Sequence, residues 1–167
     1  ILQGRNDQDV LALVAFALAK GIDLAFIEEM PLGVIDDHDR AQTMLTSAAL
    51  RAMIEPHHAL LPEGADYRSG PATYYRVAGS QTRLGFISPH SHNFCGDCNR
   101  VRLTAEGRLL LCLGHEHSID LRAPLRAGVS DAELADMIRL ALLRKPERHE
   151  FDLAGEPQIV RFMNMTG

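Results

Sequence analysis

The first part of the chain changes from a helical to a strand-like hydrophobic pattern. Apolar residues recur with helical spacing between Val10 and Leu18, after Asn6-Asp7, which can cap a helix. Gly21 is expected to end this helix, and the apolar stretch 22–27 predicts a short strand buried on at least one face. A helix, a glycine and a strand in this order form one step of a parallel α/β fold.

A polar loop at residues 29–39 follows the carboxyl end of this predicted strand. Ligands of α/β sheets and barrels bind at that end, so the loop is a candidate for ligand contacts. A second helix is predicted from Thr46 or Ser47 to about Ile54.

Beyond residue 70 the pattern changes to short segments of alternating apolar and polar positions. The segments 72–78 and 82–87 predict two strands. The segments 100–104 and 108–113 predict a hairpin around Ala105-Glu106-Gly107. Predicted strands dominate after residue 70, whereas predicted helices dominate before it. This change indicates a second structural region.

A last helix is predicted near the end of the chain. Ser130-Asp-Ala-Glu is a capping pattern, and apolar residues with helical spacing follow it from Leu134 to Leu143. Arg68-Ser-Gly-Pro71 is typical of a boundary segment. We therefore expect one domain at residues 1–70 and another at residues 71–167.

Composition and charge narrow the possible classes of protein. The chain has 167 residues, of which 46% are hydrophobic and 23% charged, as in a globular domain. A net charge of −5 argues against a nucleic-acid surface, and no apolar run approaches the ~18 residues of a membrane span. The chain does not begin with Met, and we expect a fragment of a longer protein.

The three cysteines are the main candidates for chemistry. An odd number does not suit a disulfide framework, and we expect a metal site in a cytoplasmic protein. Cys95 and Cys98 form a close pair, and Cys112 follows after thirteen further residues. A hairpin loop at 104–106 or 105–107 is expected to bring Cys112 back beside Cys98, with Cys95 one turn away, so that three thiolates can converge on one point.

The spacing leaves two kinds of metal site open. The three cysteines with His115 could form a closed tetrahedral zinc site. Alternatively, three thiolates could hold a four-iron cluster and leave one iron open to a substrate atom. Arg100 and Arg102 lie two residues apart on the predicted strand, so both point to one face. Two guanidiniums beside a metal form a fork for phosphates or a carboxylate.

The stretch from Phe94 to Leu113, with its three cysteines and two arginines, resembles the C-terminal cluster motif of the MoaA family. These are radical S-adenosylmethionine GTP cyclases that begin molybdenum cofactor synthesis. The resemblance also covers four other segments and thus nearly the whole chain. These segments are residues 4–7, 21–31, 119–126 and 145–151.

The resemblance implies a fold and an activity. The fold would be α/β, with the end of an incomplete parallel (TIM-like) barrel followed by a mixed α+β cluster-binding domain. The activity would be that of a GTP 3',8-cyclase, a lyase, with this chain as its substrate-binding half. S-adenosylmethionine and a first [4Fe-4S] cluster would belong to the N-terminal half. GTP, a second copy in a homodimer and the next enzyme of the pathway would be its partners, with no nucleic acid or membrane.

The resemblance also implies roles for individual residues. Cys95, Cys98 and Cys112 match the ligands of the second [4Fe-4S] cluster. Arg100 and Arg102 match arginines that contact GTP, and Met30 matches a position that contacts S-adenosylmethionine.

The chain departs from the family pattern at three places. It lacks the first-cluster motif Cys-x3-Cys-x2-Cys, so we expect no activity from this chain alone. Ala25 stands where the family usually has an arginine, and the chain ends in one glycine, Gly167, rather than two. The alternative is a structural or interaction domain without catalytic activity, stabilised by zinc on three cysteines and His115. Zinc could also occupy the thiolates after loss of a cluster.

Overall fold

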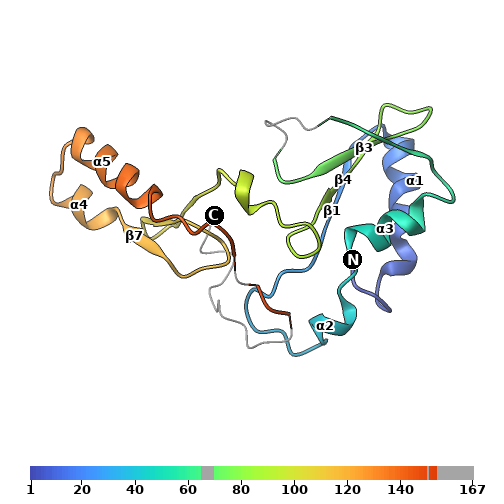
Figure 1. Cartoon of the computed structure of the whole chain (residues 1–167), viewed down its shortest axis with the longest axis horizontal. Coiled ribbons are helices and arrows are strands. Elements are labelled where there is room, and N and C mark those ends of the chain that lie inside the picture. The colour runs from blue at the N-terminus through green and yellow to red at the C-terminus, as the bar shows by residue number, and fades with distance from the viewer. Residues whose placement is uncertain (65–69, 150, 154–167) are drawn as a thin grey trace. The chain divides into compact units, whose positions relative to one another are not determined.

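The computed structural model describes residues 1–64, 70–149 and 151–153. The chain forms two compact units (Figure 1). Unit 1 consists of Ile1–Met30 and Asp36–Phe94, and unit 2 of Pro31–Ile35 and Cys95–Gly167, as far as its residues are described. The division predicted at residue 70 stays a prediction, and most of its boundary segment lies outside the described residues.

Both units mix helices and strands. The helical elements are η1 (Asp7–Asp9), α1 (Val10–Lys20), α2 (Arg40–Thr43), α3 (Ser47–Ile54), η2 (Cys95–Asp97), α4 (Arg122–Arg126) and α5 (Asp131–Leu142). The strands are β1 (Leu24–Ile27), β2 (Leu60–Pro62), β3 (Thr73–Val77), β4 (Arg83–Ile87), β5 (Arg102–Leu103), β6 (Arg108–Leu110) and β7 (Ser118–Asp120). Among the described helices, none has the length and apolar character needed to cross a bilayer.

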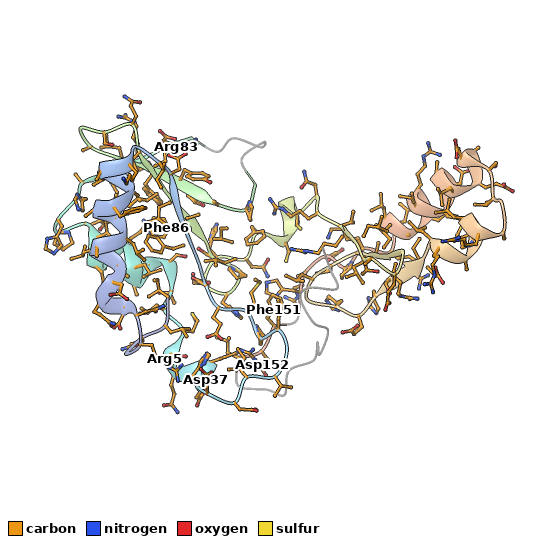
Figure 2. All side chains as sticks on the ribbon, turned by 180° about the vertical axis from the view of Figure 1, so that it is seen from behind. Arg5, Asp37, Arg83, Phe86, Phe151 and Asp152 are labelled. Carbon is orange, nitrogen blue, oxygen red and sulfur yellow. The ribbon has the colours of Figure 1, made fainter. Side chains whose placement is uncertain are left out.

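Unit 1 is a four-stranded sheet with α1 and α3 packed against it (Figure 1). Its core joins apolar side chains of both helices to those of the sheet, and Phe86 lies among them (Figure 2). The members of this core are Val10, Val14, Phe26, Leu50, Ile54, Val77, Leu84 and Phe86. Each large apolar side chain contributes roughly 1.5–3 kcal/mol when it is fully buried.

Local capping explains the end of α1 and the starts of α3 and α5, as predicted. The predicted cap at Asn6-Asp7 is wrong, because α1 begins after Asp9 without a side-chain cap. Gly21 ends α1 in the left-handed region at φ 64°, where a residue without Cβ is favoured. The Thr46 side chain accepts the N–H of Ala49 at the start of α3. Ser130 and Glu133 form a reciprocal capping box at the start of α5.

The sheet of unit 1 is mixed, and the described residues form no barrel. β1 and β4 are parallel neighbours, as expected for an α/β fold, but β2 and β3 complete the sheet in antiparallel fashion. Only residues 78–82 separate β3 from β4. A connection this short can join antiparallel strands only, because a parallel connection needs a crossover of about a dozen residues or more.

Unit 2 contains a three-stranded antiparallel sheet in the order β5-β6-β7. Leu109, Leu111 and Leu121 form its buried core with Ala141 of α5. The predicted hairpin is present, and Gly107 closes its turn at φ 79°.

The register of this hairpin is the one expected for a loop at 105–107, with Leu103 opposite Leu109. This register is offset by two from the one that would place Cys112 opposite Cys98. The ladder ends at the Arg102–Leu110 pair, so the expectation that the hairpin register places Cys112 beside Cys98 is wrong.

Candidate metal and anion site

Cys95 and Cys98 lie on one tight turn in unit 2. Cys95 begins the 3-10 turn η2, and the N–H of Cys98 donates to the Cys95 carbonyl at 3.1 Å. Cys112 follows β6 directly after buried Leu111. All three cysteines are half-buried thiols outside any disulfide. This state suits metal ligands, because a thiol must lose its proton before its sulfur binds a metal.

Among the described residues, backbone N–H groups donate to the sulfurs of Cys95 and Cys112. The N–H of His149 lies 3.4 Å from Sγ of Cys95, and the N–H of Gly114 lies 3.4 Å from Sγ of Cys112. N–H groups directed at sulfur stabilise negative charge there and are typical partners of iron–sulfur ligands. The donor set of free thiols with N–H donors therefore fits an iron–sulfur cluster chemically.

The described residues do not contain a ready group of three His, Cys, Asp or Glu side chains around one point for a metal ion. A single tetrahedral zinc with ~2.3 Å bonds would need its sulfurs within roughly 3.8 Å of one another. A cluster binds each thiolate through a different iron, so its ligands stand further apart. His115 also has other neighbours, since its Nε2 lies 3.0 Å from the Arg148 carbonyl and its ring stacks on His117.

One lysine ties together the backbone beside the cysteines. Nζ of Lys145 donates to the carbonyl of Arg100 at 3.1 Å and to that of Leu111 at 2.7 Å. These carbonyls lie two residues after Cys98 and one residue before Cys112. The segments that carry the cysteines are therefore held side by side, although the β ladder does not reach them.

Arg100 and Arg102 are the cations closest in sequence to the cysteine pair. Both are half-buried, and Arg102 opens β5. Within the described part of the chain, no hydrogen bond or ion pair joins either guanidinium to another residue. In contrast, Arg5 and Arg83 each bind an aspartate at 2.7 Å or less. The two site arginines are thus available to an anionic ligand.

Met30 lies in unit 1, three residues after the end of β1, and is half-buried. Met30 thus lies at the carboxyl end of a strand that has a parallel neighbour, the end at which α/β sheets bind their ligands.

Glu28, which no motif in the sequence marks, is 1% exposed and directly follows β1. Its carboxylate accepts the N–H groups of Ser47, His90 and Ser91 at 2.9–3.0 Å and the Ser91 hydroxyl. Burial acts to raise the pKa of Glu28, but these hydrogen bonds outweigh it and hold the pKa below its ordinary value. The only signal in the sequence is an acidic residue immediately after an apolar strand.

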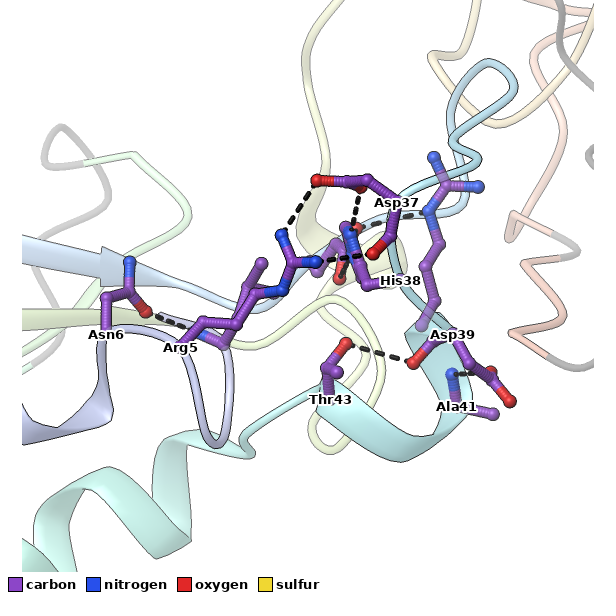
Figure 3. A network of polar contacts seen from close by, with 10 residues as sticks. Arg5, Asn6, Asp37, His38, Asp39, Ala41 and Thr43 are labelled. Atoms are coloured by element: carbon purple, nitrogen blue, oxygen red, sulfur yellow. Dashed lines mark hydrogen bonds and ion pairs between the residues drawn. The ribbon is translucent and has the colours of Figure 1, made fainter.

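A second polar cluster follows in the loop after β1 (Figure 3). His38, with a side chain only 7% exposed, donates to Asp37 at 2.7 Å and contacts Glu29 at 2.8 Å. Arg40 binds the same Glu29 at 3.2 Å, and Arg5 binds Asp37. Asp37 first, and then Glu29, raise the pKa of His38 above its ordinary value. This network holds part of the polar loop at residues 29–39, which is the candidate for ligand contacts, in place.

Comparison with known proteins points to the same family as the motif of three cysteines and two arginines. Residues 22–151 match the family Molybdenum Cofactor Synthesis C. The chain is 54% identical over 168 residues to a GTP 3',8-cyclase of Marinobacter nauticus and 57% identical over 169 residues to GTP 3',8-cyclase 1 of Pseudomonas aeruginosa. Each match covers 100% of this chain and 51% of the relative, so the chain spans about half the length of these curated relatives. The chain therefore belongs to the GTP 3',8-cyclase (MoaA) family of molybdenum cofactor synthesis, within its Molybdenum Cofactor Synthesis C region.

Proposed function

We propose that this chain is the substrate-binding half of a GTP 3',8-cyclase, a lyase that converts GTP to the cyclic pyranopterin precursor of molybdenum cofactor. The observation that carries the proposal is the grouping in unit 2 of free thiols, N–H donors and two arginines without described partners. This grouping lies inside the segment that matches the family.

Cys95, Cys98 and Cys112 would hold a [4Fe-4S] cluster as three thiolates. When bound, the cluster supplies one iron without a protein ligand, to which an atom of the guanine can bind. The chain positions the thiolates through the η2 turn and through Lys145, and it places N–H donors at Cys95 and Cys112.

Arg100 and Arg102 would bind the phosphates of GTP. Arg102 opens β5, whereas Arg100 lies two residues before that strand, so the predicted strand begins later than expected. Positions two apart on an extended backbone share a face, and neither arginine binds a carboxylate among the described residues. Arginine is suited to this role because its planar fork matches phosphate oxygens. Each charged hydrogen bond contributes roughly 1.5–3 kcal/mol, so the pair favours a polyphosphate over a nucleoside.

The remaining parts of the reaction require more chain than is present here. The sequence has three cysteines in all, so the radical-generating cluster and most of the S-adenosylmethionine site would belong to the other half. Met30 would contact S-adenosylmethionine from the end of β1. The parallel β1–β4 pair would be the last part of a barrel, since β1 is an edge strand whose Ala25 and Ile27 are exposed.

Binding of GTP to the anaerobically prepared chain tests the proposal. The double variant Arg100→Ala/Arg102→Ala should bind GTP at least about tenfold more weakly, since the lost hydrogen bonds contribute roughly 1.5–3 kcal/mol each. Arg126→Ala, at an exposed arginine at the end of α4, is the matched control and should leave the affinity unchanged. Equal GTP affinity in the double variant and in the control would refute the assignment of the two arginines.

Measurement of iron, sulfide and zinc in the same preparation distinguishes the GTP cyclase from a zinc-stabilised interaction domain. Cys112→Ala should lose iron and sulfide, whereas a zinc-stabilised interaction domain would contain zinc in the unaltered chain and would not bind GTP. Retention of iron by Cys112→Ala would show that Cys112 is not a cluster ligand.

A further inference from the structure

The segment after α5 contacts both parts of the chain that carry cysteines. We call residues 145–149 together with Phe151 the strap. Nζ of Lys145 binds the carbonyls of Arg100 and Leu111, the Arg148 carbonyl lies 3.0 Å from Nε2 of His115, and the N–H of His149 donates to Sγ of Cys95. The strap therefore reaches the backbone after Cys98, the backbone before Cys112, the side chain of His115 after Cys112, and one sulfur directly.

The strap is also packed closely against the turn that follows Cys112. A Cβ added at Gly114 would lie 2.6 Å from Cβ of His149 and 3.0 Å from Cε1 of the Phe151 ring. Gly114 is buried, and the rings of His149 and Phe151 lie 4.2 Å apart over it. Its missing side chain is thus what allows the strap to approach while the N–H of Gly114 donates to Cys112.

We propose that the strap positions the cluster ligands and that the His149 N–H, donated to Cys95, sets the reduction potential of the cluster. This inference rests on the proposed function, because it takes Cys95 as a cluster ligand. It assigns a role to a segment that lies 33 residues or more after Cys112 in sequence.

The direction of the effect follows from electrostatics. Reduction adds one negative charge to the cluster, and an N–H dipole directed at a ligand sulfur stabilises that charge. Loss of the donor therefore makes reduction harder and moves the potential to a more negative value. Loss of the packing at Gly114 frees the turn of Cys112 from the segment that holds Cys95, which weakens retention of the cluster.

The first experiment separates the backbone donor from the side chain of His149. In the cluster-loaded 167-residue chain, a redox titration followed by EPR compares His149→Pro, which lacks the N–H, with His149→Ala, which keeps it. We expect a more negative midpoint for His149→Pro and a midpoint near that of the unaltered chain for His149→Ala. Equal midpoints in all three proteins, or equal shifts in both variants, would overturn the role of the N–H.

The second experiment keeps every backbone N–H and fills the space at Gly114 into which the strap packs. Gly114→Ala is compared with Gly64→Ala, where an added Cβ meets nothing within 4 Å. We expect Gly114→Ala to release iron to a chelator roughly tenfold faster, as for other partners of metal ligands. In the metal-free chain, Cys95 should also react faster with iodoacetamide, as measured by mass spectrometry of its peptide. The same rates in both glycine variants would overturn the proposal, even where His149→Pro does not fold.

The two proposals fail in different ways. If the unaltered chain takes up no iron, the cluster assignment fails, and alkylation of Cys95 in the metal-free glycine variants alone decides whether the strap covers that cysteine. If the unaltered chain holds the cluster and every variant matches it, the strap proposal fails and the cluster assignment stands.

Discussion

Replacement of Glu28 by glutamine tests how the end of β1 is held in place. The two carboxylate oxygens of Glu28 have different partners. Oε2 accepts the N–H groups of His90 and Ser91. Oε1 accepts the N–H of Ser47 and the hydrogen of the Ser91 hydroxyl. Ser47 is the first residue of α3, where a negative charge is favoured by the helix dipole. One side chain therefore joins β1 to α3 and to the loop after β4.

The cost of the substitution follows from these partners. In Glu28→Gln the amide oxygen can replace Oε2, and the NH₂ group can donate to the Ser91 hydroxyl after that hydroxyl rotates. The N–H of Ser47 then faces an NH₂ group and has no acceptor there. A buried N–H without a partner costs about 1–3 kcal/mol, so the free energy of unfolding should fall by roughly that amount.

The dependence on pH gives a second, independent signature. Because folding lowers the pKa of Glu28 below its ordinary value of 4.5, the carboxylate stabilises the fold fully above that pH. This contribution is lost as the pH falls through the lower pKa of the folded state. The difference in stability between the unaltered protein and Glu28→Gln should therefore be largest at neutral pH and should shrink below pH 4.5.

Urea unfolding followed by circular dichroism at several pH values measures both effects. Glu55→Gln, at an exposed glutamate at the end of α3, is the matched control and should change the stability little. A loss in Glu28→Gln no larger than in the control, or a loss that does not change between pH 7 and pH 3, would refute the reasoning.

Two further predictions concern unit 1. The pKa of His38, followed by NMR, should lie above 6.5 and should fall in Asp37→Asn, so the stabilisation by charged His38 is present below pH 6.5 and lost as the pH rises through its folded pKa; an unchanged midpoint in Asp37→Asn would contradict this. Gly85→Ala places a Cβ 2.8 Å from the Tyr74 ring and should lower the free energy of unfolding by about 1–3 kcal/mol, whereas a thermal midpoint equal to that of the unaltered chain would show that the ring can move aside.

Local signals in the sequence predicted the long elements of the fold well. The glycine after α1 and the caps of α3 and α5 act within a few residues, so their pattern is visible in the sequence. β2 and β7 were missed because their conformation comes from pairing with another strand and not from a local sequence pattern. The antiparallel part of the first sheet also depends on such pairing.

The site was predictable only where its chemistry is concentrated in a short motif. The spacing of the three cysteines and the two arginines is visible in the sequence, and the family comparison supports the motif. The partners of Glu28 lie 19 to 63 residues away, and His149 lies 54 residues from Cys95. Contacts made by backbone N–H groups at such separations do not depend on residue type, so no pattern of side chains reveals them.

Under the proposed function, three thiolates would leave one iron of the cluster open to the substrate. The most direct test is the EPR spectrum of the reduced, anaerobically prepared chain, recorded with and without GTP. We expect an iron–sulfur signal that changes when GTP is added, because a substrate atom would become a ligand of the cluster. An iron–sulfur signal that GTP leaves unaltered, or a chain that holds only zinc, would contradict this expectation.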